Sequence, residues 1–303
     1  MAREFPFSPP TLSRPEAGEG VDFLWRNITC QARTMKPAAF DYESPRDLAT
    51  AVKLLAANDG AAKVMAGGQS LGPMLNMRLA QPTLLIDVRG ISELREARET
   101  ADSIVLGSCV THAAIEDGSV PDATRGLMRA VAADIAYRAV RNRGTLGGSL
   151  CHADPAADWV SVLMLVSAVA VVEGPQGRRE IAVGKFVTAP FSTTLEENEI
   201  LVGLRIPKLS ANARWGHYKF CRKPGEFAEA IGAVLVDPER GVCRALIGAT
   251  RAAPHVIENA DYIAGTFDSA RAYAAVDAAG VGDDPYERQI HHVALKRAAA
   301  RCA

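Results

Sequence analysis

Hydrophobic positions first become regular after Ser44. An apolar stripe with helical spacing follows this residue, which is the expected N-cap, and ends near Gly60. Short apolar runs at 63–66 and 83–88 predict two strands, and the first of them leads directly into the glycine-rich stretch "AGGQSLG". The pattern therefore predicts a small unit of helix and strands around a glycine turn.

The later segments alternate irregularly between strands and helices. We expect strands at about 103–110, 168–173, 179–183 and 200–206, and helices from about 111, over 121–137 and over 158–167. Beyond Pro207, strands at about 214–221, 229–236 and 242–249 precede helices at about 254–265, 268–279 and 286–300. The irregular order predicts an α+β fold rather than a doubly wound α/β fold.

These segments divide the chain into three parts. Residues 1–34 lack sustained periodicity and are expected to be a mobile N-terminal tail. Residues 35–207 form one domain with halves at about 35–92 and 93–207, and residues 213–303 form an α+β domain with a three-stranded antiparallel sheet and helices.

Charge and composition exclude several classes of function. Lys and Arg number 34 and Asp and Glu 35, so the 303-residue chain lacks the basic surplus of a nucleic-acid-binding protein. The longest apolar run, 159–172, is shorter than the roughly 20 residues that cross a bilayer. Six scattered cysteines without a C-x-x-C pair predict no zinc or iron–sulfur site and no disulfide framework. We therefore expect a cytoplasmic protein with reduced thiols, no transmembrane segment and no metal ligands of its own.

The stretch "VMAGGQSLG" (residues 64–72) allows three interpretations. A P-loop is excluded because Pro73 occupies the place of the phosphate-binding lysine. A serine hydrolase would use Ser70 as the nucleophile of a G-x-S-x-G elbow, and its acid and base would come from Asp154, His152, His291 or His292. That elbow needs a helix directly after the serine, which Pro73 disfavours, and the chain lacks the regular strand–helix alternation of the hydrolase fold.

The third interpretation is a turn that holds the phosphates of a cofactor through backbone N–H groups. It gains support from a second glycine-rich stretch, "GTLGGS" (residues 144–149), about 80 residues further along the chain. Glycine permits the backbone angles that such anion-binding turns require. Two turns that face each other would suit a pyrophosphate.

Both stretches lie within longer strings that resemble one protein family. "AGGQSL", "RNRGTLGGSLCHADPAAD" (141–158), "LEENEILVGLRIP" (195–207) and "YKFCRKPGEFAEAIGAV" (218–234) are similar to segments of the FAD-binding medium subunit of the molybdenum hydroxylases. This is the family of xanthine dehydrogenase and aerobic carbon monoxide dehydrogenase. The resemblance covers about residues 35–300 and implies a two-part FAD-binding domain of the vanillyl-alcohol-oxidase (PCMH) type over 35–207. It also implies a C-terminal domain of the carbon monoxide dehydrogenase flavoprotein type.

The resemblance also implies which residues contact FAD. It places Asp158 on the adenosine side, Leu201 against the flavin ring and Lys219 near the pyrimidine end of the flavin, and Ile135 at an apolar contact. Ser149 stands where the family often has Asn, and His217 where carbon monoxide dehydrogenase-like members have an aromatic residue. The residues expected along the pyrophosphate and ribose are Val64, Met65, Ala66, Gly67, Gly68, Gln69, Ser70 and Leu71, with Thr145, Leu146, Gly147, Gly148 and Ser149 as the second half of the cradle.

The function implied is electron transfer rather than complete catalysis, so no catalytic residue is assigned to this chain. The [2Fe–2S] centres and the molybdopterin-bound molybdenum would belong to a small and a large partner subunit, in a dimer of heterotrimers. Electrons would reach FAD from the iron–sulfur centres and leave to an external acceptor. The alternatives are the serine hydrolase and a scaffold subunit that keeps the fold without the flavin.

Overall fold

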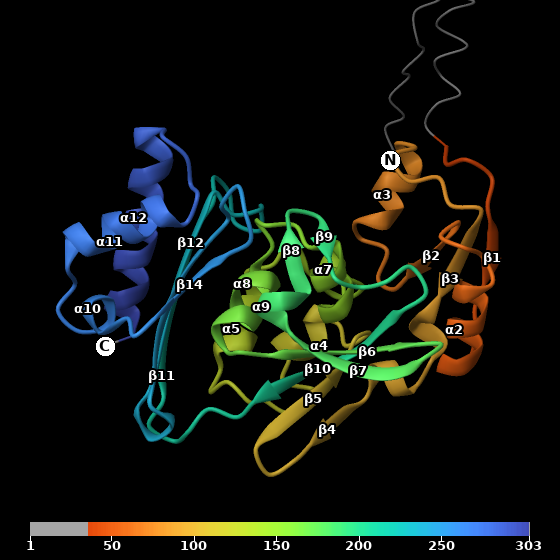
Figure 1. The fold of residues 1–303 in the computed structure, drawn as a ribbon, viewed down its shortest axis with the longest axis horizontal. Coiled ribbons are helices and arrows are strands. Elements are labelled where there is room, and N and C mark those ends of the chain that lie inside the picture. Colours follow the sequence, from red (N-terminus) through yellow and green to blue (C-terminus); the bar gives the residue numbers. More distant parts are fainter. Residues whose placement is uncertain (1–35, 303) are drawn as a thin grey trace, which may run out of the picture.

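The computed structural model describes residues 36–302, so the tail expected over residues 1–34 lies outside the described part of the chain. Three larger sheets follow one another along the chain, and helices pack against each of them (Figure 1). The mixture of parallel and antiparallel sheets with helices confirms the α+β class.

The first sheet is parallel, with strand order β1-β3-β2. Helix α2 packs on it through four buried side chains at helical spacing. The N-cap of α2 is Asp47, whose carboxylate accepts a hydrogen bond from the backbone N–H of Thr50 at 2.8 Å, so the expectation that Ser44 caps this helix is wrong. The elements are β1 (Asp41–Glu43), α2 (Leu48–Ala56), β2 (Ala62–Met65), α3 (Leu71–Asn76), β3 (Leu84–Asp87), η2 (Val88–Gly90) and η3 (Glu93–Arg95).

The second sheet is antiparallel, with strand order β4-β5-β10-β6-β7. Strand β10 forms its centre, and the pairing of β10 with β6 shifts between Leu201 and Gly203. The strands are β4 (Ala97–Glu99), β5 (Ser103–Gly107), β6 (Val169–Gly174), β7 (Gly177–Ala182) and β10 (Ile200–Pro207), and a separate hairpin joins β8 (Val187–Ala189) to β9 (Ser192–Thr193).

The helices of this second part differ from expectation at two places. The helix expected over 121–137 covers only Leu127–Ala133, and a turn follows in which Ala136 has a positive φ of 44°. The second glycine stretch is not a loop, because Thr145 caps a helix whose first turn contains both glycines. The helices are α4 (His112–Glu116), α5 (Leu127–Ala133), α6 (Arg138–Arg141), α7 (Leu146–His152), α8 (Asp158–Leu165) and α9 (Val183–Phe186).

The third sheet has four antiparallel strands, so the expectation of three strands is wrong. A helix was expected over 254–265. The first part of this segment is instead the fourth strand, β14, and only the short helix α10 forms in its second part. The long helix α12 packs closely on the sheet because Gly216 and Gly232 carry no side chain there: a Cβ on either would lie 2.5 Å or less from the α12 backbone. The elements are β11 (Arg214–Phe220), β12 (Ala230–Asp237), η4 (Pro238–Arg240), β13 (Val242–Gly248), β14 (His255–Glu258), α10 (Asp261–Ala264), α11 (Ser269–Ala278) and α12 (Pro285–Arg301).

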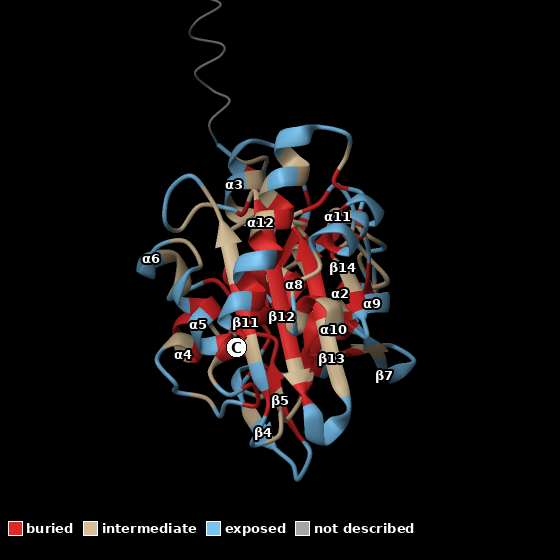
Figure 2. Cartoon of the chain, turned by 90° about the vertical axis from the view of Figure 1, so that its left-hand side faces the viewer, coloured by how far each residue is buried: buried red, intermediate tan, exposed pale blue. Residues whose placement is uncertain are grey.

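The other face of this third sheet rests on α8, which joins the two larger parts of the molecule. Trp159 in α8 and Ile231 in β12 belong to one continuous buried cluster. Figure 2 shows this as a band of buried residues that runs through β12, β13 and α8. The contact fixes β11 and the start of α8 relative to each other, which positions the charged pair described below.

Candidate cofactor site

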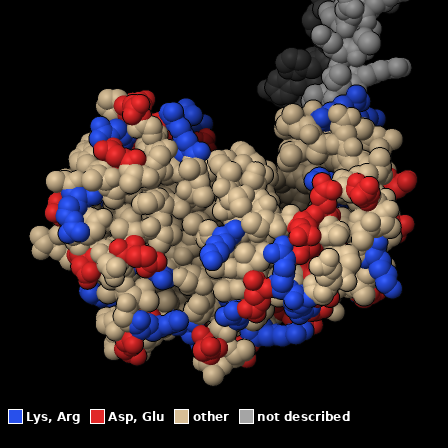
Figure 3. Space-filling model, in the orientation of Figure 1, with Lys and Arg blue, Asp and Glu red and all other residues tan. Residues whose placement is uncertain are grey.

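The two glycine motifs, which are far apart in the sequence, touch each other in the fold. A Cβ on Gly67 would lie 2.1 Å from the carbonyl oxygen of Arg143, and a Cβ on Gly148 would lie 3.8 Å from the Cβ of Ala66. The part that carries α3 and the part that carries α7 and the β8–β9 hairpin flank a hollow in the molecular surface (Figure 3). The motifs therefore lie together, and glycine at position 67 is what allows their backbones to approach.

The first motif presents a run of free backbone donors. Val64 and Met65 end β2, residues 66–70 form the turn, and Leu71 begins α3. Within residues 36–302, the backbone N–H groups of residues 67–71 have no hydrogen-bond acceptor. Gly68 adopts a φ of 70°, which a residue with a side chain rarely adopts, while the side-chain amide of Gln69 closes the turn onto the carbonyl of Gly67 at 3.1 Å. Such successive free donors favour an anionic ligand.

The second motif is different, because the backbone N–H groups of residues 146–149 already donate within the protein. The N–H groups of Leu146 and Gly147 donate to the carbonyls of Val110 and Ser108 at 2.9 Å, and the N–H of Gly148 donates to the hydroxyl of Thr145 at 3.1 Å. Ser149 donates its N–H to the carbonyl of Thr145. The expectation of free backbone donors is therefore wrong for residues 146–149, where the glycines serve close packing instead. A Cβ on Gly147 would lie 2.5 Å from the Cβ of Ser108.

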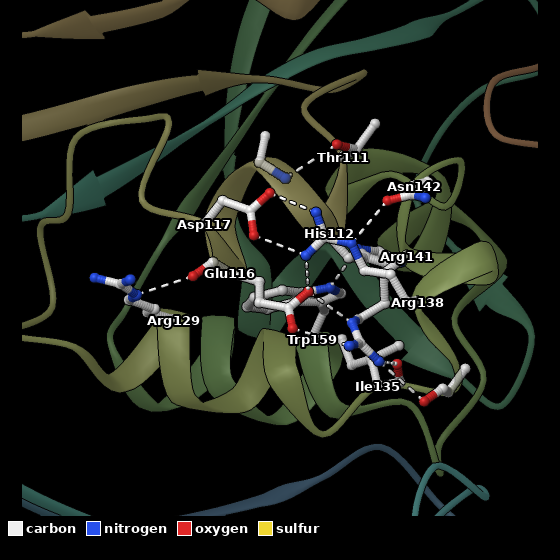
Figure 4. A network of polar contacts seen from close by, with 12 residues as sticks. Thr111, His112, Glu116, Asp117, Arg129, Ile135, Arg138, Arg141, Asn142 and Trp159 are labelled. Carbon is white, nitrogen blue, oxygen red and sulfur yellow. Dashed lines mark hydrogen bonds and ion pairs between the residues drawn. The ribbon is translucent and has the colours of Figure 1, made fainter.

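A buried histidine supports the entry to the second motif. The ring of His112 lies against Gly144, where a Cβ would come within 2.8 Å of it. Its Nδ1 accepts a hydrogen bond from the indole N–H of Trp159 at 2.9 Å, so the ring is neutral with its proton on Nε2 (Figure 4). Burial lowers the pKa of His112 to about 4, and the positive charge of Arg141 contributes to this.

Asp158 and Lys219 meet as a buried ion pair. The Nζ of Lys219, from β11, lies 2.8 Å from the Oδ2 of Asp158, the first residue of α8, and both side chains are 6% exposed. Burial raises the pKa of Asp158, and the ammonium of Lys219 opposes the rise. The other carboxylate oxygen, Oδ1, is buried without a hydrogen-bond partner among the described residues. The separate places expected for these residues, at the adenosine side and at the flavin end of an extended FAD, are therefore incompatible with their direct contact.

Two apolar residues expected at the cofactor lie where core packing also explains them. Leu201 in β10 is buried in the central cluster, beside the shift in strand pairing. Ile135 is half-buried at the edge of the same cluster. The structure thus brings the two motifs together and brings Asp158 to Lys219.

Sequence reasoning missed the residues that hold the turn after α5. Arg141 donates to the carbonyls of Ile135 and Ala136 at 3.0 and 3.1 Å and forms a two-point contact with Glu116. Arg141 opens the string "RNRGT", three residues before the second motif begins at Gly144, so the signal was present. Its partners come from α4 and from the irregular turn, and the sequence does not show which carbonyls an arginine will reach.

The serine hydrolase hypothesis has no support in the fold. No hydrogen bond links Ser70 to a histidine in the described part of the chain; His292 contacts Ser269 instead, and His112 contacts Trp159. Within residues 36–302 there is also no group of three His, Cys, Asp or Glu side chains suited to a metal ion. None of the helices described there is both long and apolar enough to span a membrane.

A family model, a protein sequence and a solved structure all relate this chain to the same kind of protein. Residues 38–209 match the model of the FAD binding domain in molybdopterin dehydrogenase. The carbon monoxide dehydrogenase medium chain of Hydrogenophaga pseudoflava is 34% identical over 89% of this chain and 100% of its own length, and the solved structure of that enzyme superposes with a TM-score of 0.78.

Two further relatives act on other compounds. The nicotine 6-hydroxylase medium subunit of Paenarthrobacter nicotinovorans is 37% identical over 67% of this chain and 71% of its own length. Quinoline 2-oxidoreductase from Pseudomonas putida 86 is 30% identical over 88% of this chain and 98% of the other chain, with a TM-score of 0.77. The chain is thus similar to subunits of enzymes with different substrates.

Proposed function

Because this chain belongs to the family of FAD-binding domains of molybdopterin dehydrogenases, we propose that it is the subunit of a molybdenum hydroxylase that holds FAD and transfers electrons. Relatives that match it over most of their length are subunits of dehydrogenase complexes. The chain is accordingly an oxidoreductase subunit. When bound, FAD supplies the redox chemistry.

The observation that carries this proposal is the run of five backbone N–H groups at residues 67–71 that have no acceptor among residues 36–302. A pyrophosphate accepts hydrogen bonds from consecutive donors of this kind without needing a basic side chain. Gly68 supplies the positive φ of the turn, and the absence of a Cβ at Gly67 lets the Arg143 backbone close against it. The residues present therefore fit the phosphate part of FAD, with the first motif as the donor and the second as the wall.

Asp158 and Lys219 form the second element of the proposed site. The free Oδ1 of Asp158 is an acceptor that would otherwise stay buried without a partner, which is costly, so a hydroxyl or N–H of the cofactor would stabilise it. Lys219 holds the other oxygen, and its ammonium opposes the rise that burial causes in the pKa of Asp158. The pair would thus orient one polar end of the cofactor, while the apolar side chain of Leu201 would pack against a ring.

The rest of the electron path would lie outside this chain. By analogy with its relatives, a small subunit would provide [2Fe–2S] centres and a large subunit the molybdopterin-bound molybdenum, in a dimer of heterotrimers. The substrate would react at the large subunit, which is why carbon monoxide, nicotine and quinoline enzymes share this kind of FAD subunit. NAD, a quinone, a cytochrome or oxygen would accept the electrons from this chain.

Purification of the full chain tests the proposal. We expect a yellow protein that shows the flavin absorption bands and releases FAD on denaturation, and co-purification with partner subunits should recover molybdenum and iron. Gly68→Val places a side chain at a positive φ and should abolish FAD retention while the chain still folds. A colourless wild-type protein that binds no added FAD would overturn the proposal, and a complex that is fully active with both Gly68→Val and Gly148→Val would point to the flavin-free scaffold instead.

A further inference from the structure

Arg141, near the proposed site, makes four hydrogen bonds through its guanidinium group. Its Nε and Nη2 donate to the two carboxylate oxygens of Glu116 at 2.8 and 2.9 Å, and its Nη1 donates to the carbonyls of Ile135 and Ala136 (Figure 4). Only 11% of the side chain is exposed. The contact with the arginine lowers the pKa of Glu116, so the carboxylate stays ionised. The guanidinium therefore links the 135–136 turn to α4 through two hydrogen bonds to the turn and two to Glu116.

The backbone conformation of this turn has to be stabilised by its surroundings. Ala136 has a φ of 44°, a backbone conformation that costs energy for a residue with a side chain and persists only where the surroundings enforce it. The two carbonyls that Arg141 holds belong to this residue and to the one before it. Arg141 thus pins a strained turn in one position.

The opposite side of the same turn faces the C-terminal domain. The carbonyl of Asp134 accepts a long hydrogen bond of 3.4 Å from the Nζ of Lys219, and the carbonyl of Ala136 lies where a Cβ on Gly225 would be 2.7 Å away. Lys219 is in turn the partner of Asp158. The turn 134–136 therefore stands between Arg141 and the buried pair, and any movement of the turn reaches the ammonium group directly.

We propose that Arg141 is a positioning residue for the cofactor site: by holding the carbonyls of Ile135 and Ala136, it fixes the turn whose Asp134 carbonyl contacts Lys219, and so sets the position of Lys219 and of Asp158. The inference rests on the proposed function, because it takes the Asp158–Lys219 pair to be part of the FAD site. Arg141 does not itself contact the cofactor in this account.

A matched control is available in Arg138, which lies on the same helix and pairs with the same carboxylate. Its Nη1 contacts Glu116 at 2.8 Å and Asp117 at 2.7 Å, and it donates to no carbonyl of the 134–136 turn. Lysine keeps the charge at either position but cannot reproduce the planar fork of an arginine. A comparison of Arg141→Lys with Arg138→Lys thus separates the tie to the turn from the charge and from the pairing with Glu116.

The dissociation constant of FAD is measured on the full-length chain for each variant by flavin fluorescence, next to the thermal unfolding of the FAD-free protein. Arg141→Lys should raise the constant about tenfold, as expected for the loss of one or two buried hydrogen bonds, and Arg138→Lys should change it less than about twofold. Lys219→Met should also weaken binding, and the double variant Arg141→Lys/Lys219→Met should be no weaker than Lys219→Met alone, because both act through Lys219.

A second variant distinguishes positioning from general loss of structure. Ala136→Gly relieves the strain in the turn, so it should restore most of the FAD affinity of Arg141→Lys. If Arg141→Lys binds FAD as the wild type does, or if its effect multiplies with that of Lys219→Met, the inference is wrong while the proposed function stands. If the wild-type chain itself binds no FAD, both are wrong.

Discussion

The Nζ of Lys219 lies 2.8 Å from the Oδ2 of Asp158, with both side chains almost fully buried, although 61 residues separate them in the sequence. Lys219 comes from the four-stranded sheet of the C-terminal part and Asp158 from the first turn of α8. The pair therefore crosses the contact between the two parts of the molecule. The packing of the two parts therefore determines whether Asp158 has a cationic partner in the proposed site.

The first prediction concerns this pair. Lys219→Met leaves a buried carboxylate without its cation, which should lower the free energy of unfolding by about 3 kcal/mol at pH 7.5. Because burial already raises the pKa of Asp158 and the variant removes the opposing ammonium, the folded variant binds a proton more tightly than the unfolded chain. The deficit should therefore shrink as the pH falls to 5.5.

Urea denaturation of the FAD-free chain at the two pH values measures the deficit. Lys208→Met is the control, because Lys208 pairs with Glu99 at the surface, where ion pairs contribute less than about 1 kcal/mol. A deficit for Lys219→Met that is equally large at both pH values would show that the unpaired carboxylate is not its cause.

The second prediction compares two glycines of the first motif. Gly67→Ala places a Cβ 2.1 Å from the Arg143 carbonyl, so the two motifs must separate and FAD affinity should fall by at least about tenfold. Gly72 lies in α3 with nothing within 4 Å of the position of a Cβ, and Gly72→Ala should leave the affinity unchanged. Titration with FAD distinguishes them, and equal affinities for the two variants would contradict the packing of the motifs.

The third prediction concerns the cap of α7. Thr145→Val removes the hydroxyl that accepts from the N–H of Gly148 and should lower the free energy of unfolding by about 1 kcal/mol. Thr145→Ser retains the hydroxyl and should stay within a few tenths of the wild type. Thermal unfolding of the FAD-free proteins provides the measurement, and a Ser variant as unstable as the Val variant would show that the methyl group matters rather than the cap.

The fourth prediction concerns the loss of stability at acidic pH. The pKa of His112 is lowered to about 4 in the fold, whereas its ordinary value is about 6.5, so the unfolded chain takes up the proton first. The contribution of the neutral ring is therefore complete above pH 6.5 and is lost between pH 6.5 and 4. The pKa of His217 is also about 4, and that residue adds to the same loss.

His112→Gln should consequently show a shallower fall in unfolding free energy over this range than the wild type, because it removes one of three histidines whose pKa the fold lowers, the others being His217 and His292. Guanidinium denaturation from pH 7.5 to 4.5 follows the slope. Identical slopes for the wild type and the variant would mean that His112 is not titrating in this interval.

Much of the local structure followed from the sequence. The strands before and after the first motif, the central strand that ends at Pro207 and helices α8, α11 and α12 were expected within a few residues of their observed bounds, because apolar spacing alone determines such segments. The predictions of secondary structure were wrong where an element depends on a partner that is distant in the sequence. Segment 254–265 contains strand β14, which pairs with β13 and completes the four-stranded sheet, and no local pattern shows that a sheet edge is available.

The sequence by itself determined that two glycine-rich motifs exist and to which family the strings around them are similar, and it predicted that their backbones bind phosphate. Only the tertiary structure decided which of the two motifs keeps its backbone N–H groups available for a ligand. Within residues 36–302 the amides of residues 67–71 have no acceptor, because they lie in the turn and at the N-terminus of α3, where a helix leaves its first N–H groups unpaired. The amides of Leu146 and Gly147 instead donate to residues 108–110. Likewise, both Asp158 and Lys219 were visible as charged residues, but their pairing depends on the packing of the third sheet, through β12 and β13, against α8. Partners of this kind are set by distances in space rather than along the chain.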